Sequence, residues 1–267
     1  MIRDMTLGQY YPVDSVIHKL DPRVKLSATF IYITALFLFR GLAGFALVTA
    51  VLFYVIHLSK IPFGYIVKGL KTVVTLLLIT VVFNLLFTST GTEYWHWGPF
   101  HLTSTGIINA VLMSVRLGYL VIGTSVMTLT TTPNALTDGL EKSLSCLNRI
   151  HVPVHELAMM MSVALRFIPI LIEETDRIMK AQTARGADFE KGNIVRRAKN
   201  MIPVLVPLFV SAFRRADDLA LAMESRCYTG GEGRTKMKPL KYGKNDRKAY
   251  LAVIVFFILV IVFRIML

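Results

Sequence analysis

The sequence predicts an all-α integral membrane protein with five transmembrane helices and a cytoplasmic module of three main helices. Of its 267 residues, 54% are hydrophobic and only 18% are charged, whereas soluble domains carry about 25% charged residues. The mean hydropathy is +0.56. Apolar runs close to the length of a membrane span recur along the chain, and the long segment between the last two runs has helical periodicity.

Five apolar runs are the predicted spans. A spanning helix needs about 20 apolar residues, with a range near 17–25, so we expect flanking polar residues to complete the first three runs. Residues 1–129 therefore form a region with four spans, residues 130–249 form the cytoplasmic module, and residues 250–267 form the last span. The runs are Val24–Phe39, Ala43–Leu58, Val73–Phe87, Ile107–Leu129 and Tyr250–Leu267.

The distribution of Lys and Arg predicts the orientation in the membrane. Basic residues flank the first run and fill the second connection, whereas the third connection has none and holds Tyr94, Trp95 and Trp97, which suit an interfacial belt. Residues 130–249 hold 20 of the 30 Lys and Arg residues. We therefore expect a multi-pass protein of the cell membrane with a cytoplasmic N-terminus and an outer C-terminus.

The net charge of +13 fits this orientation and contact with the lipid bilayer. A nucleic-acid partner is not expected, because the chain shows no basic platform interleaved with aromatic residues.

The predicted cytoplasmic module is unusually apolar. Thr132 is a suitable N-cap and Pro133 a suitable first residue for its first helix. Two long helices follow, and their segments Leu157–Ile172 and Met201–Phe213 are apolar on nearly every face. Such faces are buried in protein or lipid, while the charges in and around them make ordinary spanning costly. We expect both helices to lie at the inner face of the membrane, covered by a partner.

The two long helices end alike. The segments DRIMKAQTARG (176–186) and DDLALAMESRC (217–227) each place an acidic residue nine positions, and an alanine four positions, before Arg185 or Arg226. A cation in the last turn and a glycine after it are common helix-capping features, so either ending alone indicates a cap. Two such endings in matching context add docking as a second hypothesis, because arginine presents five donors in a rigid fork suited to carboxylates and carbonyls. The spacing alone does not decide between capping and docking.

The chain resembles the transmembrane T component of energy-coupling factor (ECF) transporters, which are ABC-type importers of vitamins and transition metals. The segments TTPNALTDGLEKSL, PVHELAMMMSVALRFIPILIEETDRIMKAQTARGADF and SRC carry this resemblance, which covers nearly the whole chain. In that family, two Arg-centred triplets end cytoplasmic coupling helices and dock into grooves on two ABC ATPase subunits. The second triplet here departs from Ala-Arg-Gly but keeps a small residue before the arginine. The matching residues are Ala184, Arg185, Gly186, Ser225, Arg226 and Cys227.

The resemblance implies an energy-coupling scaffold. Two ABC ATPase subunits would hydrolyse ATP, and this chain would pass their movement to a membrane-embedded, substrate-binding S component for micronutrient uptake. Met159, Met160 and Leu205 are candidates for the S-component interface. The resemblance leaves open which vitamin or metal is imported and whether several S components share one T component.

We expect no catalytic residue, cofactor or metal site in this chain. No GxxxxGK[ST] phosphate loop is present, and two cysteines give no disulfide or metal motif. His151 and His155 have a spacing that can hold a metal on one helix face, but they lack the HExxH order.

An integral-membrane enzyme acting on a lipid or phosphate substrate is the alternative. Arg116, Arg166, Glu173, Glu174 and Asp176 would then line a site, since ionisable residues near a membrane are functional candidates by default. The absence of a recognisable nucleophile or metal motif counts against it. We favour a structural ion pair or carbonyl contact for Arg116, and a structural link between helices for Arg166.

The predicted topology can be tested by labelling. Single cysteines placed at Thr92 and at Lys241 should react with a membrane-impermeant reagent from opposite sides, because the first lies in the outer connection and the second in the cytoplasmic module. Labelling of both positions from one side would exclude the five-span arrangement.

Overall fold

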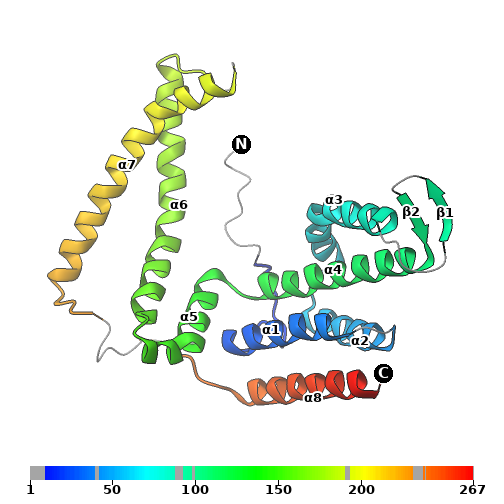
Figure 1. Ribbon diagram of the computed structural model, residues 1–267. Helices are drawn as coiled ribbons and strands as arrows, with labels where there is room; N and C mark the ends of the chain where they lie inside the picture. Colours follow the sequence, from blue (N-terminus) through cyan, green and yellow to red (C-terminus); the bar gives the residue numbers. More distant parts are fainter. Residues whose placement is uncertain are drawn as a thin grey trace. The chain divides into compact units, whose positions relative to one another are not determined.

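The protein is predominantly helical in the computed structural model, which describes residues 10–39, 42–87, 93–97, 100–189, 193–230, 237 and 239–266. Figure 1 shows long helices joined by short connections, with one two-stranded hairpin. In chain order the elements are α1 (Pro22–Leu38), α2 (Leu42–Ser59), α3 (Phe63–Phe87), β1 (Glu93–Trp97), β2 (Phe100–Thr103), α4 (Ser104–Thr130), α5 (Pro133–Leu144), a 3₁₀ helix (Ser145–Ile150), α6 (Val154–Ala184), α7 (Ile194–Glu224) and α8 (Lys244–Met266).

The chain divides into two compact units. One contains residues 8–139 and 240–267, and we call it the bundle unit. The other contains residues 140–239 and includes α6 and α7, and we call it the α6–α7 unit. The last helix therefore returns to the unit that the first half of the chain builds.

The core of the bundle unit joins its first and last helices. Ala35 and Leu36 of α1 pack with Val48 of α2 and with Phe256 and Val260 of α8. A second cluster forms where α2, α3 and α4 meet, and it consists of Ile56, Ile61, Ile66, Val126 and Leu129. These clusters explain why α8 packs along α1 although most of the sequence separates them.

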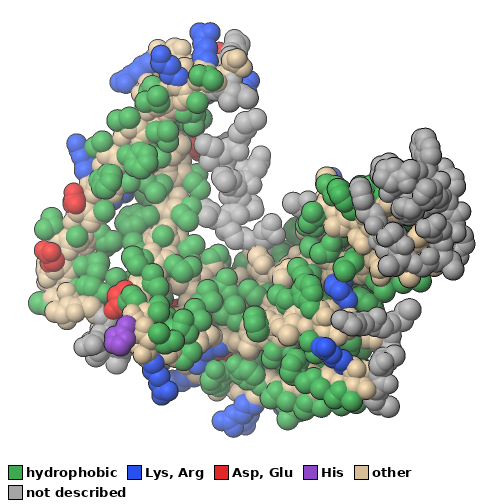
Figure 2. Space-filling view, in the orientation of Figure 1, with side chains coloured by type: hydrophobic (Ala, Val, Ile, Leu, Met, Phe, Trp, Pro, Cys, Tyr) green, Lys and Arg blue, Asp and Glu red, His purple; other side chains and the backbone are tan. Residues whose placement is uncertain are grey.

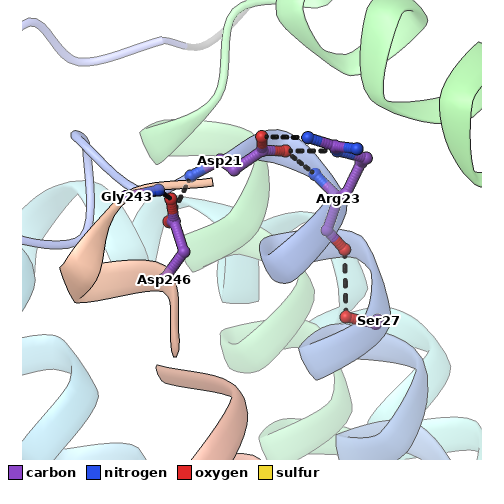
Figure 3. Close-up of polar contacts among 5 residues, drawn as sticks. All are labelled: Asp21, Arg23, Ser27, Gly243 and Asp246. Atoms are coloured by element: carbon purple, nitrogen blue, oxygen red, sulfur yellow. Dashed lines mark hydrogen bonds and ion pairs between the residues drawn. The ribbon is translucent and has the colours of Figure 1, made fainter. Parts of the chain in front are cut away.

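A polar junction fixes the N-terminal ends of α1 and α8 (Figure 3). Asp246, in the first turn of α8, accepts hydrogen bonds from the backbone N–H groups of Asp21 at 2.8 Å and Gly243 at 2.7 Å. Asp21 caps α1 by accepting from the backbone of Arg23, and it also accepts from that residue's guanidinium. Burial opposes ionisation of Asp21, but the hydrogen bonds and charge of Arg23 prevail and lower its pKa.

Lys25 connects the same end of α1 to the end of α4. Its side chain is buried, and its ammonium group donates to the carbonyl oxygens of Thr130 at 2.8 Å and His18 at 3.2 Å. The backbone N–H of Tyr11 donates to the carbonyl of Leu129 in the same place. The starts of α1 and α8 and the end of α4 are therefore held together at one end of the bundle.

The predicted apolar runs coincide with α1, α2, α3, α4 and α8, apart from Phe39, which follows α1, and Leu267, which lies outside the described residues. The count of five spans is not confirmed. Among the described residues, three helices could cross a membrane by length and composition, namely Ser104–Thr130, Val154–Ala184 and Lys244–Ile265. A fourth is possible if α3, bent by 57° between Phe63–Lys71 and Val73–Leu86, counts as one span. This set includes α6, which the charge pattern assigned to the cytoplasmic module.

The third connection contains an antiparallel hairpin in which Trp97 pairs with Phe100. Its second strand leads directly into α4, where the side chain of Thr103 accepts a hydrogen bond from Gly106 N and caps the helix. The side chains of Tyr94, Trp95 and Trp97, predicted to form an interfacial belt, fall outside the residues whose side chains are described.

The junction of α1 and α8 should be a main source of stability in the bundle unit. Asp246→Ala should lower the free energy of unfolding by about 2–3 kcal/mol, because the buried N–H of Asp21 and the part-buried N–H of Gly243 lose a charged acceptor. Denaturant unfolding of the purified protein in one detergent would measure the change. Asp14→Ala is the matched control, since this exposed carboxylate pairs only with exposed Lys19 and should contribute less than about 1 kcal/mol. Equal losses in the two variants would contradict the proposed importance of the junction.

Candidate functional site

The two long helices of the α6–α7 unit run in opposite directions. Each has 31 residues, which corresponds to a length of about 46 Å. They contact each other along the pair, and the chain turns back between them (Figure 1). The end of α6 at Arg185 and the end of α7 at Arg226 therefore lie at opposite ends of the pair.

The end of α6 is a Schellman motif. The backbone N–H of Gly186 donates to the carbonyl of Thr183 at 2.9 Å, and that of Ala187 donates to the carbonyl of Gln182 at 3.0 Å. These are the two bonds that define the motif. Gly186 has φ +88°, the left-handed conformation that the motif requires after the C-cap. Arg185 is the C-cap residue.

The end of α7 repeats this motif bond for bond. The backbone N–H of Cys227 donates to the carbonyl of Glu224 at 2.8 Å, and that of Tyr228 donates to the carbonyl of Met223 at 3.0 Å. Cys227 has φ +54°, so it takes the left-handed position that glycine takes in α6. Arg226 therefore occupies the same structural position as the first arginine, and the sequence match between the endings reflects one shared backbone geometry.

Both arginine side chains are exposed. Within the described parts of the chain, the guanidinium groups of Arg185 and Arg226 have no hydrogen-bond or ion-pair partner. The helix dipole favours a cation at each position by about 0.3–1 kcal/mol. This interaction with the helix dipole uses none of the guanidinium N–H groups, so all of them are available to an acceptor on another protein. The neighbouring residues Ala184, Gly186, Ser225 and Cys227 are small, which lets an acceptor approach closely.

One polar contact ties the end of α6 to the first third of α7. Pro207 has no backbone N–H, so the carbonyl of Pro203 lacks its usual donor within the helix. The side chain of Gln182 donates to this carbonyl at 3.3 Å. Gln182 also belongs to the Schellman motif that positions Arg185. Sequence reasoning missed this contact, although two prolines four residues apart signal a freed carbonyl.

The rest of the contact between α6 and α7 is loose. A cavity of about 310 Å³ lies between them, and an ion pair of 3.3 Å between Glu174 and Arg215 borders it. Three alanines of α7, four residues apart, face larger apolar side chains of α6 across this cavity. The apolar lining includes Val163, Phe167, Leu171, Ala212, Ala216 and Ala220. The two helices are therefore joined by a few polar contacts and not by a continuous core.

The apolar faces of both helices are exposed in the isolated chain. Met160 is 55% exposed and Leu205 is 42% exposed, whereas Met159 is half-buried. Phe209 and Phe213 of α7 are more exposed still. Figure 2 shows hydrophobic side chains along α6 and α7, with basic side chains at the end where α6 gives way to α7. The predicted S-component role of these residues stays a prediction.

The other candidate residues make structural contacts or none. Arg116 donates to the carbonyl of Phe39 at 2.8 Å, which is one of the two structural contacts expected for it. The structural link between helices expected for Arg166 is not seen, because this exposed side chain has no partner within the described ranges. The ion pair between α6 and α7 is formed by Arg215 and Glu174. His155 pairs with Glu141 at 2.9 Å. No observation therefore favours the membrane-enzyme alternative.

Comparison with known proteins identifies the family. A family model described as "Cobalt transport protein" matches residues 14–237. Proteins named "Energy-coupling factor transporter transmembrane protein EcfT" are similar along nearly their whole length. The protein from Clostridium kluyveri is 52% identical over 99% of this chain and 98% of its own, and that from Bacillus subtilis is 44% identical over 96% of each. The chain belongs to the ECF transporter T-component family. It is thus a membrane subunit of a multisubunit transporter.

Both arginine-containing helix endings lie within the part of the chain that matches the family model, which covers all of α5, α6 and α7. In both motifs the residue after the arginine has to adopt the left-handed backbone conformation. This residue is glycine in α6 and cysteine in α7.

The two motifs should respond oppositely to exchange of their left-handed residues. Gly186→Ala should destabilise the end of α6 by about 1–2 kcal/mol, because a Cβ is unfavourable at positive φ. Cys227→Gly should instead slow local opening at the end of α7. Hydrogen exchange of the backbone amides at 186–187 and 227–228, followed by mass spectrometry, would measure both effects. Gly118→Ala is the control, since this Cβ would meet no atom within 4 Å and should leave both ends unchanged. Faster exchange at 227–228 in Cys227→Gly would contradict the shared geometry.

Proposed function

We propose that this chain is the energy-coupling scaffold of an ECF-type ABC importer. Two ABC ATPase subunits hydrolyse ATP, and the α6–α7 unit passes their movement to a membrane-embedded S component that binds the micronutrient. The observation that carries this proposal is the same Schellman motif, with an exposed arginine at the C-cap, at opposite ends of one helix pair.

Two equivalent ends fit two partners of the same kind. Arg185 and Arg226 have the same backbone position, so each presents its guanidinium to a similar groove in the same way. A groove with carboxylate or carbonyl groups would match the planar donor fork. Because the ends lie at opposite ends of the pair, one docks on each ATPase subunit, and the triplets Ala184–Gly186 and Ser225–Cys227 form the contacts.

The polar contacts between α6 and α7 transmit movement from one helix to the other. A displacement at Arg185 acts on the last turn of α6, which Gln182 joins to the carbonyl of Pro203. Internal prolines weaken the hydrogen-bond ladder of α7 near this point. The cavity between the helices leaves room for them to change their packing. A displacement of α6 can therefore be passed to α7 without disrupting a tight core between the two helices.

The exposed apolar faces of α6 and α7 pass the movement to the S component. Met160 and Leu205 lie on helices whose large apolar side chains are uncovered in this chain, and such surfaces mark interaction sites with protein or membrane. A membrane-embedded S component would cover them. ATP can shift the complex only if these helices contact its partners differently in the two states of the ATPases.

The proposal includes the topology expected from the charges. Residues 130–249 form the cytoplasmic module and the N-terminus is cytoplasmic, while the C-terminus lies outside. The apolar length of α6 is compatible with this arrangement if the membrane-embedded partner covers the helix at the inner face.

Loss of both arginines should uncouple the ATPases. Arg185→Ala and Arg226→Ala should each reduce transport, because truncating one side of a buried charged contact costs about 2–5 kcal/mol. Either single variant should retain some ATPase, since the remaining end keeps the partner at a high effective concentration. The double variant should release the ATPases and abolish transport. Pull-down with the affinity-tagged chain and substrate uptake in proteoliposomes are the two measurements.

Lysine substitutions distinguish docking from capping. Arg185→Lys and Arg226→Lys should restore little transport if the planar fork is needed, whereas a simple cap would accept lysine at a cost below about 1 kcal/mol. Arg177→Ala is the matched control, since this arginine is exposed on α6 but lies away from the helix end. A double alanine variant that binds both ATPases and transports normally would exclude the docking role.

The apolar faces should bind the S component and not the ATPases. Met160→Glu and Leu205→Glu should each weaken S-component association while leaving ATPase association intact, because an unpaired carboxylate is costly to bury. Co-purification of each partner with the tagged chain would measure the two effects separately. Ile150→Glu, at a residue 72% exposed outside α6 and α7, serves as the control. An intact complex with both variants would show that these faces are not the interface.

A further inference from the structure

A cavity of about 460 Å³ lies within the bundle unit, between α1, α2, α4 and α8. This volume is within the range of about 300–1,000 Å³ that small-molecule sites occupy. Residues of the connection before α1, including Val16 and Leu20, line one end. That end coincides with the polar junction where α1 and α8 begin and α4 ends.

Most of the cavity is an apolar slot. Its walls include Tyr32 of α1, Val51 of α2 and the α8 residues Ala252 and Phe256. Gly123 of α4 also lines it, and a Cβ at this position would lie 2.3 Å from the ring of Tyr32. Glycine is therefore required for that ring to lie where it does. A slot of this kind suits a hydrocarbon chain.

The end at the polar junction carries positive charge. Lys25, Asn245 and Lys248 line the cavity there. Lys25 is only 8% exposed, and its two hydrogen bonds go to uncharged carbonyl groups. A buried ammonium group without a direct ion-pair partner is costly. Within the described ranges no carboxylate lies at ion-pair distance from it.

The nearby acidic groups are already engaged. Asp21 and Asp246 attract Lys25 electrostatically. However, Asp21 accepts hydrogen bonds from Arg23, and Asp246 accepts from two backbone N–H groups. The third donor of Lys25, together with exposed Lys248 and Asn245, is therefore available to an anion at the mouth of the cavity.

We propose that this cavity binds an anionic phospholipid, with its phosphate headgroup at Lys25, Asn245 and Lys248 and an acyl chain in the slot beside Tyr32 and Phe256. The inference is independent of the docking role of the arginines. Basic pockets between membrane helices are known to hold anionic headgroups. Such a lipid requires cations for its phosphate group and an apolar space for an acyl chain. The buried cation and the second cation at the rim meet the first requirement, and the adjoining slot meets the second. A helix of a partner protein would need a carboxylate at the same depth to satisfy Lys25.

Lipid titration tests the proposal on the full chain in a nonionic detergent. Native mass spectrometry should show one retained dioleoyl-phosphatidylglycerol and at least about fivefold weaker retention of dioleoyl-phosphatidylcholine. Lys248→Ala should weaken phosphatidylglycerol binding about fivefold, since one juxtamembrane cation is removed. Ala252→Trp should block the slot and abolish retention. Arg247→Ala is the matched control, because it removes the same charge from the next residue, which does not line the cavity.

Several results would overturn the proposal. These are equal retention of the two lipids, equal effects of Lys248→Ala and Arg247→Ala, or unchanged retention in Ala252→Trp. Competition by millimolar inorganic phosphate would indicate a free-anion site instead of a lipid site. Release of the lipid when the other transporter subunits assemble would identify a protein segment as the occupant. Lys248 and Ala252 are exposed positions, so neither substitution removes a buried contact needed for folding.

Discussion

The carboxylate of Asp246 is the contact on which the bundle unit depends. It accepts from the backbone at Asp21 and Gly243 and so joins two helix starts that lie 225 residues apart in the chain. Because α8 is held in register with α1, the buried residues Phe256 and Val260 reach the core cluster. The same arrangement brings Lys248 of α8 and Lys25 of α1 into the lining of one cavity. One buried, fully used carboxylate thereby orders the bundle and its charged end.

The two units are held together by different kinds of contact. The bundle unit has two apolar clusters and a buried polar junction, whereas α6 and α7 are joined by an ion pair, one side-chain hydrogen bond and a partly empty apolar contact. A loosely joined helix pair changes its packing at low cost, which suits a coupling element. A bundle whose helix ends are fixed by a buried polar junction suits a membrane support.

Capping and docking are compatible roles for Arg185 and Arg226. The Schellman motif fixes the backbone at the C-cap and therefore the point from which each arginine side chain extends. The motif also satisfies the last carbonyl groups through backbone donors, so neither arginine is needed for that purpose. The backbone turn thus provides a defined geometry at both helix ends, and the arginine side chains remain exposed.

Local sequence patterns identified most of the helices, because apolar periodicity, proline at the first helical position and the capping residues act within a few residues. The starts of α3 and α8 were not identified, since these helices begin at Phe63 and Lys244, before the predicted runs. The sequence located α5 at Pro133, the endings of α6 and α7 and, through resemblance, the family. The tertiary structure was needed to find the bend in α3, the partner of Arg116, the Asp246 junction and the contact between Gln182 and Pro203. Each of the three contacts joins residues that are distant in the chain, and the bend in α3 lies between Lys71 and Val73, just before the predicted apolar run, in a stretch that the sequence pattern assigned to a connection. Their formation depends on how the helices pack, which local sequence patterns do not specify.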